Sequence, residues 1–196
     1  MTRSYNADRI RRRLSLFTID TLFRLIHERH AGTPLGVAVA PSRFSDPKGK
    51  YAVLYAAGTV PCALWEGLVR NRLARRQRRE IPKQEVKETR VVSLTASEPL
   101  ALVDLRDDGP VRIGAPTAVA HDSNHAAGRA LSAATHGLVP ESDGFLFQSR
   151  FTGHNCLALF DRAIVKLEAL DVEPLMLRPE FADALTEYEI TLRDRP

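Results

Sequence analysis

Two charged side chains stand inside apolar stretches of this sequence, where an ion is costly unless another group pairs with it. Arg24 lies within the run Leu-Phe-Arg-Leu-Ile, and Glu66 lies within Cys-Ala-Leu-Trp-Glu-Gly-Leu. Because a buried ion loses its hydration, two explanations are open: the two residues form a structural ion pair, or both line a polar pocket. Arg43, which precedes a turn, and Tyr55, within an apolar run, are weaker candidates for the same pocket.

No cofactor-binding motif accompanies these residues. The sequence has neither Gly-x-Gly-x-x-Gly nor a P-loop, and it has no Gly-x-Ser-x-Gly turn. Cys62 and Cys156 are each flanked by apolar residues, which predicts two reduced thiols in the core. His121, His125 and His136 lack the carboxylates that would complete a zinc site, so we place them on a helix surface. The sequence therefore predicts neither a metal nor a bound cofactor.

Predicted strands carry two of the candidate residues. Arg24 lies in a strand over residues 22–27, and Tyr55 lies in a strand over residues 52–57. The second strand is apolar on both faces, which is typical of a central position in a sheet. Further strands are predicted over residues 36–40, 86–95, 100–105, 144–147 and 156–160.

A predicted helix over residues 60–79 carries Glu66. Thr59 can cap this helix, and Pro61 lies in its first turn, where a missing N–H has no cost. Two further helices are predicted, over residues 8–20 and from Asp122 or Ser123 to Ala134, the latter closed by Gly137.

These elements predict an α+β fold, a single mixed domain in which peripheral helices cover short central strands. The chain has 196 residues and no repeat or long linker, so one domain is expected over its whole length. Within it, the candidate residues occupy a core of about residues 20–165. Residues 1–19 are expected to form a basic N-terminal helix, and residues 166–196 an extension packed on the core.

The charge is unevenly distributed along the chain. Residues 1–90 hold 19 Lys and Arg against 8 Asp and Glu, whereas residues 91–196 hold 9 against 16. Much of the excess lies in two arginine runs, within residues 9–13 and 70–79. Such runs bind anions, nucleic acid or an acidic protein, or they are solvated helix ends. A non-catalytic basic binding module is therefore one functional alternative, although no aromatic residues interleave the arginines as in many nucleic-acid-binding sites.

The composition is that of an ordinary globular protein, with 44% hydrophobic and 27% charged residues. No stretch approaches the roughly 18 apolar residues of a membrane helix, and residues 1–13 lack the apolar region of a signal peptide. Together with the two reduced cysteines, these features predict a cytoplasmic protein without a membrane partner.

Five short motifs, taken in order, resemble the RES domain, which is named for its Arg, Glu and Ser. Each motif is weak alone, but their order and spacing over residues 20–165 are fairly specific. The motifs are Leu22-Phe23-Arg24, Ser42-Arg43-Phe44-Ser45-Asp46-Pro47, Val53-Leu54-Tyr55 leading to Ala63-Leu64-Trp65-Glu66, Gly144-Phe145-Leu146-Phe147-Gln148-Ser149-Arg150, and Asn155-Cys156-Leu157-Ala158-Leu159-Phe160-Asp161.

The resemblance implies an enzyme with a fold similar to that of ADP-ribosylating toxins. RES proteins cleave NAD⁺ at the nicotinamide–ribose bond by phosphorolysis or hydrolysis, and some transfer ADP-ribose to a protein. The implied partners are NAD⁺ as substrate, inorganic phosphate as co-substrate in phosphorolysis, and an Xre-type antitoxin. The protein is expected to form either a homo-oligomer or a hetero-oligomer with this antitoxin. Nucleic acid would be reached only through that antitoxin.

The resemblance also assigns roles to residues. Glu66, Arg24 and Tyr55 would be catalytic, with the carboxylate stabilising the positive charge that develops on the ribose. NAD⁺ would be bound by Arg24, Arg43, Tyr55, Ser149 and Asn155, the arginines on the diphosphate and the tyrosine ring on the nicotinamide. One departure concerns the backbone near the substrate: Pro41-Ser42 stand where the family often has Gly-Gly, and Ser45 stands where it has Asn.

Overall fold

The computed structural model describes residues 4–46, 48–70 and 79–194. Its centre is a curved eight-stranded sheet in the order β1-β6-β7-β8-β3-β2-β5-β9, in which β6 and β7 are parallel and the other neighbours antiparallel. The strands are β1 (Leu14–Phe17), β2 (Leu22–His27), β3 (Val53–Ala57), β5 (Thr89–Ala96), β6 (Leu100–Asp104), β7 (Gly144–Gln148), β8 (Asn155–Phe160) and β9 (Leu167–Pro174). The α+β prediction is confirmed.

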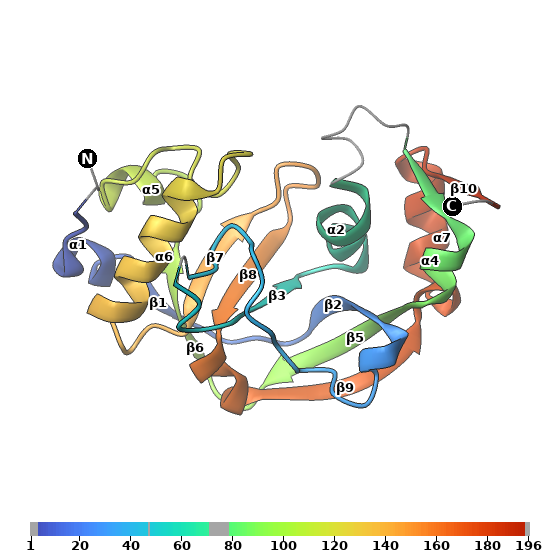
Figure 1. Cartoon of the computed structure of the whole chain (residues 1–196), viewed down its shortest axis with the longest axis horizontal. Helices are drawn as coiled ribbons and strands as arrows, with labels where there is room; N and C mark the ends of the chain where they lie inside the picture. The colour runs from blue at the N-terminus through green and yellow to red at the C-terminus, as the bar shows by residue number, and fades with distance from the viewer. Residues whose placement is uncertain (1–3, 47, 71–78, 195–196) are drawn as a thin grey trace.

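Helices gather at both ends of one side of the sheet (Figure 1). The three helices near β1, β6 and β7 are α1 (Ala7–Arg11), α5 (Gly109–Arg112) and α6 (Ala126–Leu138). At the other end lie α2 (Val60–Leu64), α4 (Lys83–Lys87), α7 (Pro179–Glu187) and the parallel pair β4 (Glu80–Pro82) and β10 (Thr191–Arg193). Short turns η1 (Glu28–His30), η3 (Asp161–Lys166) and η4 (Leu175–Leu177) complete the elements outside the site.

The strands alternate between two buried faces. In β3, Leu54 and Ala56 pack in one hydrophobic cluster, whereas Tyr55 and Ala57 belong to a second cluster under α6. A third cluster, which includes Leu64 and Trp65, fills the space between α2 and α7. Because side chains alternate along a strand, Tyr55 must face the helices.

The helix that carries Glu66 begins as predicted. The Thr59 hydroxyl accepts the Cys62 N–H at 3.3 Å, and Pro61 occupies the first turn. After α2 the helix widens into a π-helical turn, η2 (Trp65–Val69), and its described part ends at Arg70. Residues 71–78, the rest of the predicted helix, lie outside the described residues.

The predicted N-terminal helix over residues 8–20 is wrong in its second half. Asn6 caps α1, its side chain accepting the Asp8 N–H at 2.8 Å, but α1 ends at Arg11. Leu14–Phe17 instead form β1, which pairs with β6. The free edge of β6 offers this segment a ladder of backbone hydrogen bonds, and this long-range pairing overrides the local helical spacing.

Three other element predictions also need correction. Residues 36–40 form no strand, and α4 occupies the first residues of the strand expected over 86–95. Helix α6 starts at Ala126, where Asn124 rather than Asp122 or Ser123 accepts the N–H, at 2.9 Å. The helix also continues past Gly137 to Leu138. Within the expected C-terminal extension, residues 167–174 form the outer strand β9, which pairs with β5 of the core.

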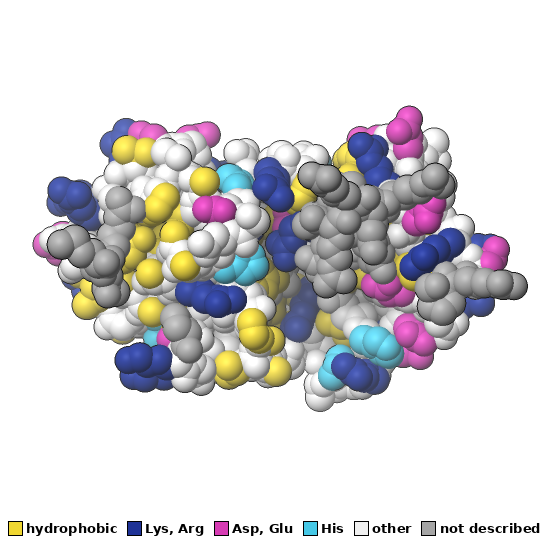
Figure 2. Space-filling model, turned by 45° about the horizontal axis from the view of Figure 1, so that its top comes forward, with side chains coloured by type: hydrophobic (Ala, Val, Ile, Leu, Met, Phe, Trp, Pro, Cys, Tyr) yellow, Lys and Arg dark blue, Asp and Glu magenta, His cyan; other side chains and the backbone are white. Residues whose placement is uncertain are grey.

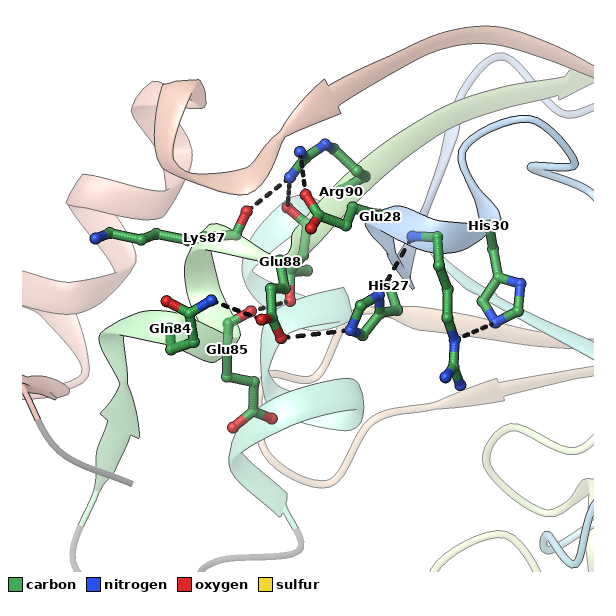
Figure 3. A network of polar contacts seen from close by, with 10 residues as sticks. His27, Glu28, His30, Gln84, Glu85, Lys87, Glu88 and Arg90 are labelled. Atoms are coloured by element: carbon green, nitrogen blue, oxygen red, sulfur yellow. Dashed lines mark hydrogen bonds and ion pairs between the residues drawn. The ribbon is translucent and has the colours of Figure 1, made fainter.

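Polar contacts fix the end of β2, the strand that carries Arg24 (Figure 3). His27 points to Glu88 with its Nε2 3.3 Å from Oε2, and Arg90 Nη2 lies 2.7 Å from Glu28 Oε2. These contacts join the end of β2 to α4 and β5, so the strand is held by side chains as well as by its ladder.

We expect the folded protein to lose stability when the pH falls below about 6.5, the ordinary pKa of histidine. Burial, aided by Arg43 or Arg162 nearby, lowers the pKa of His121, His125 and His136. The unfolded chain therefore binds more protons than the folded one in this range, so the stabilisation present above pH 6.5 is lost on acidification. Melting temperatures between about pH 7.5 and pH 5.5 should fall, and a flat profile would contradict this account.

Candidate active site

A cavity of about 220 Å³ lies between β2, β3 and the helix α2–η2. It opens in the hollow between the two halves of the face in Figure 2, where Lys and Arg side chains gather. It brings together Arg24, Arg43, Tyr55 and Glu66, four of the residues predicted from the sequence. The other lining residues are Phe23, Leu25, Ser42, Ala56, Ala57, Ala63, Gly67, Arg70, Phe147 and Cys156.

Both carboxylate oxygens of Glu66 have partners. Oε1 accepts the Ser149 hydroxyl at 2.7 Å, and Oε2 lies 2.9 Å from Arg70 Nη1. The side chain retains 21% of its exposure, so the clamped carboxylate still faces the cavity. Glu66 lies in the π-helical turn, and such turns often occur at functional sites.

Ser149 is almost fully buried and is held by its own loop. Its Oγ accepts the Phe151 N–H at 3.2 Å, and its backbone N–H donates to the His154 carbonyl at 2.8 Å. The hydroxyl hydrogen is therefore directed to Glu66. Ser149 does not itself line the cavity, so its contact with the cavity runs through that carboxylate.

Arg24 and Glu66 share the cavity but do not form the ion pair that the sequence left open. The Arg24 guanidinium donates to the carbonyls of Pro34 and Gly36, at 3.1 and 2.9 Å. Burial lowers the pKa of Arg24. Of the two explanations, the geometry supports the polar pocket.

Arg43 is the most deeply placed cation of the cavity, with 8% of its surface exposed. Its Nη1 donates to the Asp122 carbonyl. Burial and, to a smaller extent, the charge of Arg70 lower the pKa of Arg43. The cavity lining holds three arginines, Arg24, Arg43 and Arg70, against one carboxylate, that of Glu66, so it favours an added anion.

The Tyr55 hydroxyl holds the loop that carries Arg43. It donates to Ser42 Oγ at 3.0 Å and accepts the Phe44 N–H at 2.9 Å. Burial raises the pKa of Tyr55, so this phenol stays protonated. The hydroxyl is thus committed to the loop, and the remaining part of Tyr55 forms cavity wall.

Helix α6 braces the same loop from the other side. Ser132 Oγ donates to the Phe44 carbonyl at 2.6 Å, and Arg129 Nε donates to the Ser42 carbonyl at 3.0 Å. At Gly128, an added Cβ would lie only 2.6 Å from the Arg43 carbonyl oxygen. The absence of a side chain at Gly128 is what lets α6 approach the Arg43 loop.

We therefore expect Gly128→Ala to destabilise the fold by about 1–3 kcal/mol, because the Arg43 segment must move to admit the methyl group. Gly137→Ala in the same helix is the matched control, since nothing lies within 4 Å of its added Cβ. That control should stabilise the protein by about 0.5 kcal/mol, as glycine is a poor helix former. Urea titrations measure both, and equal effects of the two substitutions would contradict the account.

Asn155, His121, His125 and His136 are not among the residues that line the cavity. Asn155 is exposed at the start of β8 and is not among the lining residues, although the next residue, Cys156, is. His121 precedes α6 and His125 is its N-cap, so only His136 lies in the helix as expected. Among the described residues, no group of three or more His, Cys, Asp or Glu is arranged to hold a metal ion.

Arg70 is the site residue that sequence reasoning placed elsewhere. It opens the arginine run over residues 70–79, which was interpreted as a partner surface or a solvated helix end. Its side chain instead turns into the cavity and pairs with Glu66. The available signal was the four-residue spacing between Glu66 and Arg70, which brings opposite charges together on a helix.

Comparison with known proteins places the chain in a family. The RES domain matches residues 21–178, most of the sequence, and the chain belongs to the RES domain family. "Probable toxin y4kH" of Sinorhizobium fredii (strain NBRC 101917 / NGR234) is 35% identical over 109 residues, which cover 55% of this chain and 86% of that protein.

The fold also matches a solved structure. A chain in the crystal structure of the M. tuberculosis MbcT–MbcA toxin–antitoxin complex superposes with a TM-score of 0.65 at 14% identity, covering 92% of this chain and 96% of that one. At this identity the match establishes a shared fold. In the described part of the chain, no helix has the length and apolar character needed to span a membrane.

Proposed function

We propose that this protein cleaves NAD⁺ at the nicotinamide–ribose bond. The observation that carries the proposal is the Glu66 carboxylate, held by Ser149 and Arg70 in a cavity that also contains Arg43 and Arg24. The family membership supports it, and the resemblance described above assigns the Arg, Glu and Ser of the RES domain to Arg24, Glu66 and Ser149.

The chemistry matches what a fixed carboxylate does well. Departure of nicotinamide builds positive charge on the ribose, and a carboxylate that is already oriented stabilises this charge without reorganising. Ser149 and Arg70 hold both oxygens of Glu66, so the carboxylate is oriented before the substrate arrives. Nicotinamide leaves as a neutral molecule, so the reaction needs no strong general acid.

The arginines suit the anionic part of the substrate. Arg43 and Arg70 both line the cavity, and a planar guanidinium group can bind two phosphate oxygens at once. Arg24 has two backbone carbonyls as partners, which leaves donors of its five for a ligand. In this assignment Arg43 and Arg70 bind the diphosphate or an incoming phosphate. Arg24 holds the loop whose carbonyls it contacts and adds a third positive charge to the cavity.

The biological role that we propose is that of the toxin of a toxin–antitoxin pair in the cytoplasm. It rests on the similarity to the probable toxin of Sinorhizobium fredii and on the fold shared with a chain of the MbcT–MbcA complex. An antitoxin would contact Arg24 or Arg43 at the cavity together with part of the arginine run, of which residues 71–78 lie outside the described residues.

Product analysis with and without inorganic phosphate tests this function. Purified protein is incubated with NAD⁺, and nicotinamide, ADP-ribose and its phosphorylated form are separated by chromatography. Nicotinamide release is the expected result, and its dependence on phosphate distinguishes phosphorolysis from hydrolysis. A mass increase on cellular proteins would instead indicate ADP-ribose transfer. No nicotinamide under any condition, from folded protein free of antitoxin, would refute NAD⁺ cleavage.

A further inference from the structure

The two cysteines of the chain meet beside the cavity. Cys62 lies in the first turn of α2 and Cys156 on β8, 94 positions apart in sequence, and their Sγ atoms are 3.4 Å apart. Both residues are free and buried, but Cys156 lines the cavity. A small solute that enters the cavity therefore reaches Cys156, whose sulfur lies 3.4 Å from that of the fully buried Cys62.

We propose that Cys62 and Cys156 form a reversible oxidation site, which a hydroperoxide entering the cavity converts into an intramolecular disulfide. A disulfide requires the sulfurs to approach to about 2.0 Å. From their present separation this is a small movement of two side chains on neighbouring elements. The proposal concerns the thiols alone and does not rest on NAD⁺ cleavage.

The surroundings of the two sulfurs differ in a way that assigns their roles. The contact with Cys156 lowers the pKa of Cys62, against the opposing effect of burial. The same contact with Cys62 raises the pKa of Cys156, and burial adds to this rise. Cys62 is therefore the more acidic thiol of the pair, which we expect to react with the peroxide first, and Cys156 then attacks the oxidised Cys62 sulfur.

The reaction balances with a hydroperoxide as oxidant. The Cys62 thiolate attacks one peroxide oxygen, the O–O bond breaks, and with one proton a water molecule leaves, which gives a sulfenic acid. The Cys156 sulfur then attacks the Cys62 sulfur, the S–O bond breaks, and the sulfenic oxygen leaves as water with the Cys156 proton. Two thiols are oxidised to one disulfide while one hydrogen peroxide is reduced to two waters.

The pair lies next to the candidate site. Cys62 lies one helical turn before Glu66, and Cys156 lines the cavity that the Glu66 carboxylate faces. A disulfide would join the start of α2 to β8 beside this cavity. Oxidation would therefore fix the start of the helix that carries Glu66 against the cavity wall.

Disulfide formation in the folded and the unfolded chain tests the proposal. Reduced protein is exposed to hydrogen peroxide either natively or in urea, quenched with catalase, denatured, and alkylated with N-ethylmaleimide. The intact mass then reports whether both thiols are free or joined with the loss of two hydrogens. We expect the native protein to close the disulfide at least about tenfold faster, because folding brings the two thiols together.

Two variants separate the roles of the sulfurs. Cys156→Ser should stop at a sulfenic acid on Cys62, which dimedone traps, whereas Cys62→Ser should react with peroxide much more slowly. Dithiothreitol should restore both thiols of the wild-type protein. Native protein whose two cysteines both remain open to alkylation after peroxide, or whose disulfide closes faster in urea, would overturn the proposal.

Discussion

Glu66→Gln should lower the rate of NAD⁺ cleavage by about 100-fold or more while the fold is kept. The substitution removes the negative charge at nearly constant volume, and the amide oxygen can still accept the Ser149 hydroxyl. What is lost is the charge that stabilises the developing cation and the ion pair with Arg70. The kcat of nicotinamide release and the melting temperature, measured on the same preparation, report the two effects separately.

Glu88→Gln is the matched control for this experiment. Glu88 also has two side-chain partners, since its Oε1 accepts Gln84 Nε2 at 2.6 Å and its Oε2 lies 3.3 Å from His27 Nε2, but it lies outside the residues that line the cavity. We expect Glu88→Gln to change the melting temperature by a small amount, similar to that of Glu66→Gln, and to leave the cleavage rate unchanged. If Glu66→Gln instead kept full activity, or lost it only through unfolding, the assigned role of the carboxylate would be wrong.

Arg70→Met should lower kcat by about tenfold, because a carboxylate held on one side only samples unproductive orientations. Arg70→Lys keeps a charge near Glu66 but cannot reproduce the planar guanidinium, so we expect a smaller loss. Arg90→Met, which breaks a similar ion pair with Glu28 away from the cavity, should leave kcat unchanged. The kinetic constants of the three variants, measured over a range of NAD⁺ concentrations, provide the comparison.

The division between kcat and KM shows what Arg70 does. A residue that orients Glu66 changes kcat more than KM, whereas a residue that only attracts the diphosphate changes KM alone. A rise in KM at constant kcat would therefore show that Arg70 does not position the Glu66 carboxylate. Equal activity of Arg70→Met and the wild-type protein would show that Arg70 has no role in the site.

The fold could be predicted where local signals decide it. The strand β3 is a continuous apolar run and β2 is one that Arg24 interrupts, and the helix start at Thr59 follows from the capping hydroxyl and Pro61. The predictions are wrong where the structure of a segment depends on a partner strand that lies far away in the sequence. The edge strand β1 forms because β6 is beside it, and the charged, exposed strand β9 has no apolar pattern that would reveal its pairing with β5.

The site could be predicted from those residues whose charge is unusual for their apolar surroundings in the sequence. Arg24 and Glu66 are charges in apolar runs, and that contrast alone indicates a pocket or an ion pair. Their actual partners are not visible in the sequence: Arg24 meets two carbonyls of a loop, and Glu66 meets Ser149 from a distant strand end. These contacts depend on backbone geometry that only the assembled sheet defines.

The resemblance to the RES domain was confirmed, and it located more of the site than composition could. It selected Ser149, whose role no local pattern indicates, and it also selected Asn155, which lies outside the cavity lining. It did not select Arg70. This residue begins a run of arginines, and the sequence does not show that its side chain turns into the cavity.

We expect the cavity beside Glu66 to bind NAD⁺ with its nicotinamide ribose against that carboxylate. A crystal structure of the Glu66→Gln protein soaked with NAD⁺ tests it most directly, because the substitution should leave the substrate intact. We expect the nicotinamide ribose within contact distance of residue 66 and the diphosphate beside Arg43 and Arg70. An empty cavity at saturating NAD⁺, or a dinucleotide bound elsewhere on the protein, would contradict the account.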